Sequence, residues 1–452
     1  MNSQTNYKQR TYLDPIHGPI KLNLTDPIDY LLSQIIDTKE FQRLRRIRQM
    51  GSGWFTFHGA EHTRFGHSLG TLFTAKKMIT HLANHYEDIN NHKTTILVSA
   101  LIHDIGHGPF SHTSEKFINS THEEWTKRII LEDSEISTLL KSHDKNLPDS
   151  IVKTMDYKNK NLYVSQLISS YIDCDRLDYL HRDSYFVGVP YGLTGSDRII
   201  SSLEINTNGS RSEITLPLPS PLLVVNEGIG IDAVVHYLQA RHSMYQQVYQ
   251  HKKNLACDFL LKKIIERVKV VNPKNISRDL IEWLNFENKP IEKINLNSYL
   301  QIDDFCLISN IQNWSNDDSF DKILSDLSNR FISRRLFKSL EFRMEVSNEK
   351  INETLEKTKQ MGKSKGFIND YYIGIEQSSS KPYEPYQVSE NENKTGKAIY
   401  IKQQNGQVKE LSEISGLVKA LSKENIIKTC LIYTPELKDE VTNLKGFNEL
   451  FK

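Results

Sequence analysis

Apolar residues at helical spacing dominate residues 1–270 of the chain. The run ILVSALIH, which ends just before Asp104, is apolar on nearly all sides and predicts a helix buried in the centre of a domain. Pro109 cannot continue a helix, so the segment HGPF at residues 107–110 must end it. The same spacing predicts helices over residues 27–48, 68–81, 95–104, 123–132, 162–183 and 229–268.

Strand signals are sparse in this part of the chain. Residues 203–216 alternate between apolar and polar side chains around Asn208-Gly209, which predicts a β-hairpin. The glycine-bounded GSGWFTF at residues 51–57 predicts a turn followed by an extended aromatic segment. Residues 1–270 are therefore expected to form a mainly α-helical domain with one hairpin.

The pattern weakens beyond residue 270. Turn formers gather at residues 378–396 and predict a linker or exposed loop. Helical spacing persists at 277–289, 316–362 and near 411–423, a hairpin is predicted around Asn405-Gly406, and TCLIYT predicts a strand. We expect a mainly α fold, with one domain over residues 1–270 and a smaller α+β C-terminal lobe over residues 271–452.

Composition narrows the class of protein. Of 452 residues, 38% are hydrophobic and 25% charged, which is typical of a folded chain. The 57 basic and 56 acidic residues nearly cancel, so no basic field recruits nucleic acid. The first residues, MNSQTNYKQR, have no apolar core, so we expect no secretory signal there, and no run approaches the roughly 18 apolar residues of a membrane span. The four scattered cysteines form no CxxC pair, so we expect reduced thiols in a cytoplasmic protein.

Histidines and aspartates cluster in a way that predicts a metal site. The dipeptide His103-Asp104 ends the apolar helix, and a buried aspartate is costly unless a cation or hydrogen bonds compensate its charge. A single His-Asp dipeptide is more often a core histidine beside a turn, and loop histidines are common. The joint arrangement makes that interpretation much less plausible, because histidine with carboxylate is the ligand set of divalent ions such as zinc, manganese and iron. The residues concerned are His67, His103, Asp104, His107, His112, Asp173 and Asp175.

Several segments in this order resemble the histidine–aspartate (HD) superfamily of deoxynucleoside triphosphate (dNTP) triphosphohydrolases. The resemblance runs from about Asp14 to Lys252, more than half of the chain. It is similar to bacterial members and to the catalytic domain of the vertebrate enzyme with a sterile-alpha-motif domain. The segments are DPIHG, FQRLRRIRQMG, RFGHSLG, HDIGHGPFSH, HEEW, IDCDRLDYLHRD and YQQVYQHK.

The resemblance implies an HD catalytic domain in residues 1–270 and a metal-dependent hydrolysis. The divalent ion, whether Mn, Fe, Zn or Mg, acidifies water and polarises the phosphoryl group. His122 works as acid or base at the α-phosphate with Glu115 as its partner, in a position where relatives usually have aspartate. His107 and His112 contact the phosphate. The implied metal ligands are His67, His103, Asp104 and Asp175.

The resemblance also implies a nucleotide pocket. Arginine suits bidentate phosphate contact, and the other matching positions face the deoxyribose and the base. The implied substrate-binding residues are Gln49, Arg64, Arg176, Tyr179, Asp183, Arg241, Tyr249 and Gln250. Spacing alone would instead make the tyrosines ordinary core aromatics and each arginine a solvent-facing side chain.

Regulation is a further implication. Relatives are often homotetramers activated by nucleotides at subunit interfaces. Arg10, Asp37, Gln42 and Arg45 match positions that bind a guanine nucleotide, GTP or dGTP, although a solvated helix face explains these residue types equally well. Two other functions stay open: an HD phosphodiesterase or phosphatase acting on another nucleotide, such as a cyclic dinucleotide, and a catalytically silent nucleotide sensor.

Overall fold

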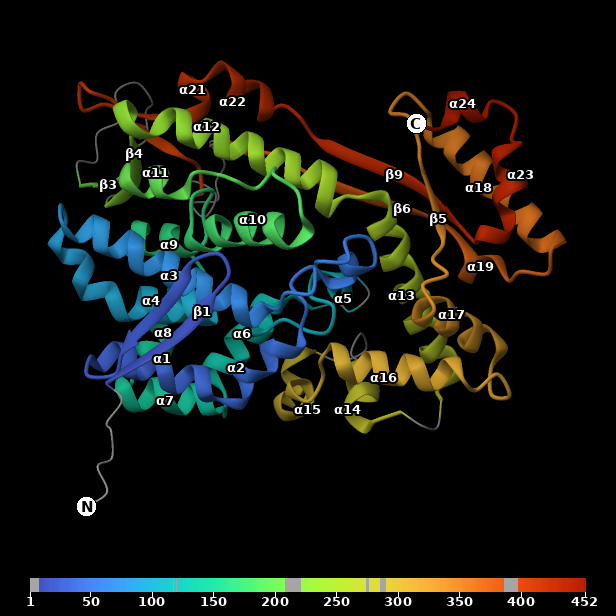
Figure 1. The fold of residues 1–452 in the computed structure, drawn as a ribbon, viewed down its shortest axis with the longest axis horizontal. Helices are drawn as coiled ribbons and strands as arrows, with labels where there is room; N and C mark the ends of the chain where they lie inside the picture. Colours follow the sequence, from blue (N-terminus) through green and yellow to red (C-terminus); the bar gives the residue numbers. More distant parts are fainter. Residues whose placement is uncertain are drawn as a thin grey trace.

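Helices dominate the structure, with small sheets between them (Figure 1), which confirms the predicted mainly α class. The structure, a computed structural model, describes residues 8–116, 118, 120–207, 221–273, 276–284, 290–385 and 397–452. The elements up to residue 187 are β1 (Gln9–Asp14), β2 (Gly18–Asn23), α1 (Pro27–Asp37), α2 (Lys39–Arg43), η1 (Leu44–Arg46), η2 (Gly51–Phe55), α3 (Arg64–Ala83), η3 (Glu87–His92), α4 (Lys93–Ile102), α5 (His112–Glu115), α6 (His122–Leu131), α7 (Glu135–His143), α8 (Leu147–Met155), α9 (Leu162–Ile168) and α10 (Cys174–Val187).

Helix α4 lies at the centre of this part, as its all-apolar sequence predicts. Residues Ile96–Ile102 have no solvent-exposed surface, and α4 packs against α3, α8 and α9. A helix that is apolar on every side is stable only when neighbours surround it. The buried α4 therefore fixes where the residues that follow it, His103 and Asp104, lie in the molecule.

Several predicted elements differ in the structure. The helix predicted over 229–268 ends at Met244 and resumes at Lys252, with a π-helical turn at Tyr245–Tyr249 between the two parts. The helix predicted over 27–48 breaks at Thr38, whose hydroxyl caps α2 by accepting the Phe41 amide. The helix predicted over 162–183 is interrupted before α10, because Asp173 accepts the amides of Ser170 and Arg176 and so starts a new helix. Residues Gly51–Phe55 form the 3₁₀ helix η2 instead of an extended segment.

The tertiary environment explains η2. The Trp54 ring stacks on Phe55 at 4.0 Å between centroids, and Phe55 packs edge-on against Phe331 at 4.8 Å. Phe331 belongs to a distant part of the chain. The sequence of residues 51–57 contains no sign of the contact with Phe331. The aromatic residues by themselves therefore predict an extended segment, which is wrong.

The remaining elements continue from helical to mixed structure. They are α11 (Ser196–Ser201), β3 (Leu203–Asn206), β4 (Leu222–Asn226), α12 (Glu227–Met244), the π-helical turn η4 (Tyr245–Tyr249), α13 (Lys252–Val271), α14 (Arg278–Leu284), η6 (Ile291–Lys293), α15 (Leu296–Leu300), α16 (Asp304–Ser315), α17 (Lys322–Ile332), β5 (Lys338–Glu341), α18 (Asn348–Ser364), α19 (Asn369–Tyr372), β6 (Ile373–Ser380), β7 (Tyr400–Lys402), β8 (Val408–Glu410), α21 (Leu411–Ile414), α22 (Gly416–Leu421), β9 (Ile426–Tyr433), η7 (Pro435–Leu437), α23 (Lys438–Thr442) and α24 (Phe447–Leu450). The helical segment predicted over 316–362 thus contains strand β5, and β6 extends into the predicted 378–396 loop, of which residues 386–396 lie outside the described part.

The sheets join distant parts of the chain. β1 and β2 form an antiparallel ladder that the sequence analysis missed, because its β1 segment QRTYLD carries no clear apolar alternation. β3 pairs antiparallel with β4. This confirms the first strand of the hairpin that the sequence predicts over residues 203–216. The second strand is residues 222–226, and the Asn208-Gly209 turn lies outside the described residues.

The C-terminal strands divide between two sheets. The predicted hairpin around Asn405-Gly406 is confirmed as β7–β8, and β7 pairs parallel with β4, with Val225 opposite Ile401. The predicted strand at TCLIYT is confirmed as part of β9, which lies between β5 and β6 in the second sheet. Figure 1 shows β6 and β9 running as long strands from the α12 side of the molecule to the region of α18 and α19.

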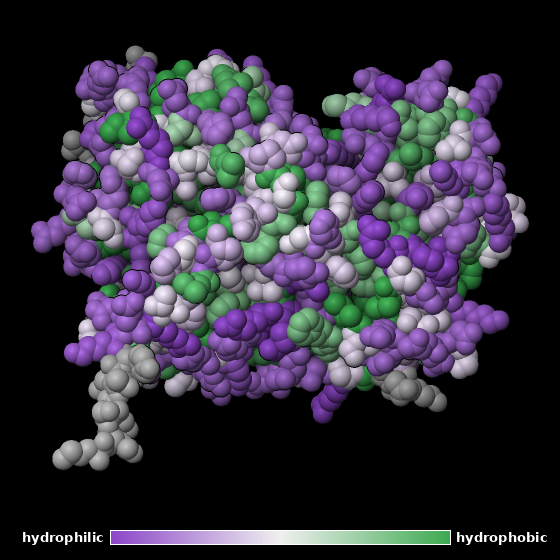
Figure 2. All heavy atoms as spheres, viewed as in Figure 1, coloured by the Kyte–Doolittle hydropathy of each residue, from purple (hydrophilic) through white to green (hydrophobic). Residues whose placement is uncertain are grey.

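One apolar core runs through both halves of the chain. Buried side chains from both halves form a continuous cluster, and α13 contacts α17, β5, β6 and β9. Cys174, Cys257, Cys306 and Cys430 are all free thiols, as predicted. In the described part, no helix is long and apolar enough to cross a membrane. The face drawn in Figure 2 is mostly hydrophilic, with apolar atoms in scattered groups.

The packing of α4 predicts a large loss of stability on truncation. Leu101→Ala removes a fully buried side chain, so we expect the free energy of unfolding to fall by about 2–5 kcal/mol. Leu131→Ala, at a side chain that is 42% exposed, is the matched control, with an expected change within about 0.5 kcal/mol. Urea denaturation followed by circular dichroism measures both. Equal losses in the two variants would contradict the central position of α4.

Candidate active site

Three helices bring the predicted metal ligands together. His67 lies in the first turn of α3, His103 and Asp104 follow the buried end of α4, and Asp175 lies in the first turn of α10. Helix α10 lies tightly against α3 because Gly70 has no side chain: a Cβ there would lie 2.0 Å from Asp178 Oδ1. The close approach of two helices thus places side chains from distant motifs around one point.

The ligand atoms converge within coordination range of a single ion. His67 Nε2 lies 3.0 Å from Asp175 Oδ1 and 3.4 Å from Asp104 Oδ2. His103 Nε2 lies 3.4 Å from Asp104 Oδ1 and 3.5 Å from Asp175 Oδ1. All four side chains come from motifs that the sequence analysis assigned to the metal, and the structure brings them together.

The Nδ1 atoms of His67 and His103 each have a polar partner on the side away from the shared point. His67 Nδ1 pairs with Asp178 Oδ2 at 2.8 Å, and His103 Nδ1 lies 2.9 Å from the carbonyl oxygen of Ala100. Both Nε2 atoms are buried and lack a hydrogen-bond partner among the described residues. A carboxylate or carbonyl on one imidazole nitrogen, with the other directed at a shared point, is the usual arrangement of metal-bound histidine.

The charge of the cluster also fits a cation. Burial lowers the pKa of His67, but its contacts with Asp175 and Asp178 outweigh burial and raise that pKa to about 10. The carboxylates therefore create a strong demand for positive charge at this point. Two imidazoles and two carboxylates form a donor set that accepts Mn²⁺, Fe²⁺ or Zn²⁺, so these residues fit a divalent metal.

Asp178 is a supporting residue that the sequence analysis did not single out. Its carboxylate is fully buried and binds Arg182 Nε at 2.8 Å and His17 at 2.6 Å, in addition to His67. Arg182 also donates to Asp14, at 2.9 Å, which anchors the β1–β2 ladder to α10. The sequence IDCDRLDYLHRD could have indicated this role. Asp178 follows Asp175 by three residues, which places the two carboxylates on one face of a helix.

A histidine–carboxylate pair lies next to the metal ligands. Glu115 Oε1 lies 2.7 Å from His122 Nδ1, and the other oxygen lies 2.9 Å from His112 Nδ1. Burial lowers the pKa of His122, but the bond to Glu115 outweighs burial and raises it. Glutamate in place of the family's aspartate still reaches His122. The pair therefore favours a protonated imidazole, whose Nε2 lies 4.0 Å from Asp104 Oδ1.

His107 has a different environment from the other histidines. Its ring stacks on that of His122 with centroids 3.9 Å apart, and the residue has no exposed surface. Burial, then the charges of Arg64 and His122, hold its pKa well below the usual histidine value. His107 therefore lies behind His122 as a neutral ring and does not line the cavity, whereas His112 does.

The HGPFSH loop has a constrained backbone. Phe110 and Ser111 have positive φ angles of 57° and 51°, which are unfavourable for residues with a side chain. The Asp304 carboxylate, at the start of α16, accepts the Phe110 amide at 2.7 Å and the Arg48 amide at 2.9 Å. Tyr299 donates its hydroxyl to the Gly106 carbonyl at 2.6 Å. Residues beyond position 270 thus hold the loop that carries the predicted catalytic histidines.

A cavity of about 650 Å³ opens over the metal cluster. Its lining includes most of the predicted substrate residues, together with side chains that the sequence analysis did not assign. The predicted lining residues are Gln49, Arg64, His103, Asp104, His112, His122, Asp175, Arg176, Tyr179, Asp183 and Tyr249. The unassigned polar ones include Lys116, Lys127, Tyr245, Asn254, Asp258 and Lys397. No local motif distinguishes these from ordinary surface residues.

Helix α10 and the turn η4 form one wall of the cavity. Asp183 Oδ1 lies 2.7 Å from His62 Nε2, and its other oxygen accepts the Tyr249 hydroxyl at 2.8 Å. Lys428 of β9 donates to the carbonyl of Gln246 at 2.6 Å, which ties η4 to the C-terminal sheet. A π-helical turn often marks a functional position, and here it presents Tyr245 and Tyr249 to the cavity.

The predicted arginines divide into two groups. Arg64 Nη1 binds Asp104 Oδ2 at 2.5 Å, and Arg176 forms an ion pair with Asp173. Arg241 does not line the cavity: it donates to the backbone carbonyls of Lys381 and Pro382. Gln250 is likewise buried outside the lining. The structure therefore brings Arg64 and Arg176 to the cavity and places Arg241 and Gln250 outside its lining.

The residues assigned to regulation form two hydrogen-bonded pairs outside the lining of this cavity. Arg10 binds both oxygens of Asp37, at 2.6 and 2.7 Å, and Arg45 Nε donates to Gln42 Oε1 at 2.8 Å. Arg10 Cζ lies 5.1 Å from the centroid of the Tyr12 ring, and Arg45 Cζ lies 3.5 Å from that of Phe65.

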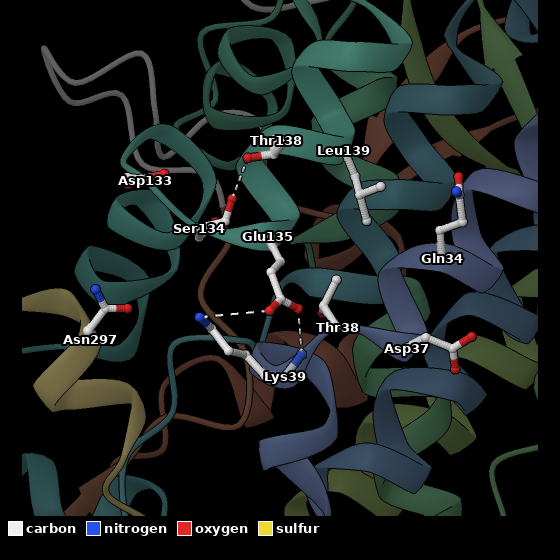
Figure 3. Close-up of a pocket in the computed structure, with 10 residues that line it drawn as sticks. All are labelled: Gln34, Asp37, Thr38, Lys39, Asp133, Ser134, Glu135, Thr138, Leu139 and Asn297. Carbon is white, nitrogen blue, oxygen red and sulfur yellow. Dashed lines mark hydrogen bonds and ion pairs between the residues drawn. The ribbon is translucent and has the colours of Figure 1, made fainter.

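Asp37 also borders a second cavity of about 590 Å³ (Figure 3). Lys39 faces Glu135 there, with Nζ 3.8 Å from Oε1. The lining holds the carboxylates of Asp37, Asp133 and Glu135 against one ammonium. Within a single chain, this charge balance does not favour a polyanion.

The fold and the site define a metal-dependent phosphohydrolase, and comparison with known proteins identifies the family. The HD domain family matches residues 64–183. The chain is 34% identical over 438 residues to the uncharacterized protein YwfO of Bacillus subtilis, in a match that covers 95% of this chain and 93% of that protein. The chain belongs to the HD superfamily.

Two further relatives extend the comparison. The deoxynucleoside triphosphate triphosphohydrolase SAMHD1 of Bos taurus is 32% identical over 213 residues, covering 39% of this chain and 35% of that protein. The crystal structure of a phosphohydrolase from Bacteroides thetaiotaomicron has a TM-score of 0.76 and 27% identity, covering 94% of this chain and 99% of that one. That fold similarity spans both halves of the chain.

The geometry predicts that His103→Ala prevents metal binding. Losing even a supporting residue weakens metal affinity by about 10–100-fold, so losing a direct ligand should leave the purified protein without bound Mn²⁺. Inductively coupled plasma mass spectrometry after dialysis measures the metal content. His58→Ala, at an exposed histidine outside the cluster, is the control and should keep it. Full metal content in a folded His103→Ala protein would disprove the assignment.

The support of the loop by α16 gives another expectation. Asp304→Ala leaves the buried amides of Phe110 and Arg48 without their acceptor, at a cost of about 1–3 kcal/mol each. We expect lower unfolding free energy and at least a tenfold lower kcat, since about 1.4 kcal/mol lost from transition-state stabilisation is tenfold in rate. Asp304→Asn keeps one acceptor oxygen, so its unfolding free energy and kcat should lie between those of wild type and Asp304→Ala. Asp318→Ala, at an exposed position, should behave as wild type. Unchanged kcat in Asp304→Ala would show that the loop keeps its geometry unaided.

Proposed function

We propose that the protein hydrolyses deoxynucleoside triphosphates to a deoxynucleoside and inorganic triphosphate. The observation that carries the proposal is the convergence of His67, His103, Asp104 and Asp175 on one point, the last three of which line a cavity with cationic and aromatic walls. The similarity to SAMHD1, whose name states this activity, supports the choice of substrate. The reaction breaks the bond between the α-phosphorus and the 5′ oxygen, and an oxygen from water replaces it on phosphorus.

The ligand set defines what a metal would contribute. His67, His103, Asp104 and Asp175 would hold a divalent ion, which supplies Lewis-acid polarisation of the phosphoryl group and lowers the pKa of water. Arg64 lies against Asp104, so its guanidinium faces the same phosphate. It stabilises negative charge that develops on the phosphoryl oxygens.

His122 is the proposed general acid. Glu115 holds its Nδ1 and raises its pKa against the effect of burial, so the proton on Nε2 is available to the cavity. Donating that proton to the departing 5′ oxygen yields the neutral hydroxyl of the deoxynucleoside. A positioned general acid contributes typically about 10²–10⁴-fold to rate.

The α10 wall is the proposed sugar site. Tyr179 lies beneath the deoxyribose, and the Asp183 carboxylate accepts the 3′-hydroxyl with Gln49 beside it. His62 and Tyr249 fix Asp183 in place. A ring of aromatic and hydrogen-bonding groups of this kind suits a nucleoside better than a phosphate ester without a sugar.

We further propose that activity is regulated in a cytoplasmic homo-oligomer, as a tetramer. The Arg10–Asp37 and Gln42–Arg45 pairs are the proposed binding residues for an activating guanine nucleotide, GTP or dGTP. Both pairs offer polar groups outside the active-site cavity, and Arg10 lies over the aromatic ring of Tyr12, which supports this assignment. The free thiols of the four cysteines are compatible with a reducing compartment.

Product analysis tests the reaction. Each dNTP is incubated with Mn²⁺ and the purified protein, singly and in mixtures, and the products are resolved by ion-exchange chromatography. We expect deoxynucleoside and inorganic triphosphate, with faster turnover in mixtures that contain dGTP or GTP. Orthophosphate release, or a linear product from a cyclic dinucleotide, would instead establish the phosphodiesterase or phosphatase alternative. Stoichiometric nucleotide binding without hydrolysis would establish a sensor.

The role of His122 has a separate test. His122→Ala should lower kcat by about 10²–10⁴-fold while the protein keeps its bound Mn²⁺ and its KM, because His122 is not a metal ligand. Glu115→Gln should lower kcat less, since the imidazole remains. His58→Ala is again the control. Loss of Mn²⁺ in His122→Ala would assign this residue to metal binding.

A further inference from the structure

The cations of the cavity differ in whether a carboxylate already neutralises them. Arg64 binds Asp104, Lys116 binds Asp258, Lys127 binds Asp156, and Arg176 binds Asp173. Lys397 is the exception: within the described residues, no carboxylate lies within ion-pair distance of its ammonium. Its Nζ instead lies over the aromatic ring of Tyr157, 5.6 Å from the ring centroid.

The position of Lys397 is fixed although its side chain is exposed. The residue directly precedes the buried segment AIYI, which leads into β7, and β7 is paired with β4. Its carbonyl accepts the Tyr171 amide at 3.3 Å, which attaches it to the wall just before α10. Lys397 is thus tied through its backbone to the wall of the cavity, three residues before β7 begins.

Lys397 lies at the opposite end of α10 from the proposed sugar site. Along α10, Asp175 and Arg176 belong to the first turn, and Tyr179 and Asp183 follow at helical spacing. At about 1.5 Å per residue, Asp183 is roughly 10 Å further along the axis than Arg176. Arg176 Cζ lies 6.0 Å from the centroid of the Tyr171 ring, and the carbonyl of Lys397 accepts the Tyr171 amide, so both cations line the cavity near Tyr171 at the start of α10.

This order of residues matches the order of groups in a nucleoside triphosphate. A sugar on Tyr179 and Asp183 and an α-phosphate at the metal ligands leave the distal phosphates to extend towards Arg176 and Lys397. We infer that Lys397, together with Arg176, binds the β- and γ-phosphates, and that the site therefore selects a polyphosphate over a monophosphate or cyclic ligand. The inference deepens the proposed function and rests on it for the placement of the α-phosphate.

The surroundings of the ammonium agree with an anionic ligand. Desolvation, followed by the neighbouring charge of Arg176, lowers the pKa of Lys397, and the charges of Asp173, Glu123 and Glu384 oppose that shift only in part. Two cations close to each other repel, and a polyphosphate chain relieves that repulsion while forming charge-assisted hydrogen bonds. Lys397 belongs to a segment far beyond the part of the chain that matches the HD domain, residues 64–183.

Binding of inorganic triphosphate tests Lys397 without requiring turnover. Isothermal titration calorimetry in a fixed concentration of Mn²⁺ compares wild type with Lys397→Met, which keeps the aliphatic stem and removes the charge. We expect at least a tenfold weaker Kd in Lys397→Met, since a hydrogen bond to a charged group contributes about 1.5–3 kcal/mol. Lys397→Arg should restore binding. Lys419→Met, an exposed lysine outside the cavity, should equal wild type.

Two further measurements separate this inference from the proposed function. Orthophosphate binding should be the same in Lys397→Met and wild type, and with dNTP the variant should show a raised KM and an unchanged kcat. Equal triphosphate binding in wild type and every variant, or none in wild type, would overturn the role of Lys397. Lys397-dependent triphosphate binding in a protein that hydrolyses no dNTP would uphold the polyphosphate site and overturn the proposed reaction.

Discussion

The concentration of buried negative charge around two imidazoles is the constraint on which the rest of the site depends. Asp104, Asp175 and Asp178 lie within hydrogen-bond or ion-pair distance of His67. Isolated carboxylates of this kind would be prohibitively expensive to bury. Arg182 and His17 compensate Asp178, and Arg64 compensates one oxygen of Asp104. The charge that remains lies beside the Nε2 atoms of His67 and His103, so the cluster can hold a divalent cation and indicates where one would bind.

Other features of the fold follow from holding that cluster rigid. α4 is surrounded by neighbours and cannot shift, α10 is brought close to α3 by a glycine, and the β1–β2 ladder is attached to α10 through Asp14 and Arg182. The C-terminal half contributes at three more points: Asp304 and Tyr299 on the loop, Lys428 on the π-helical turn, and Pro382 on Arg241. The half of the chain without any catalytic motif is therefore a structural part of the site.

A feature of the fold or the site could be predicted from the sequence when the residues that determine it lie close together in the chain. Helical spacing alone indicates that His103 and Asp104 end a buried helix. The choice of His67 and Asp175 as their partners came from the resemblance of short motifs to the HD superfamily, and the structure brings these four side chains together. Asp304, Lys397 and Lys428 act on residues far away in the sequence, and nothing in their own neighbourhoods reports those contacts. The same reason explains η2, whose shape depends on Phe331. Arg241 matched a motif position, yet its partner, the Pro382 carbonyl, is a backbone group that no side-chain pattern encodes.

The parallel pairing of β4 with β7 has a consequence for the order of folding. Residues 222–226 leave the ribosome long before residues 400–402, which supply their partners. During synthesis the HD helices can pack around α4, but one edge of the four-stranded sheet stays open until the chain is nearly complete. Because closing so long a loop is slow, the cavity acquires its last wall late. A truncated or stalled chain thus contains every predicted metal ligand but lacks Lys397 and with it part of the cavity lining.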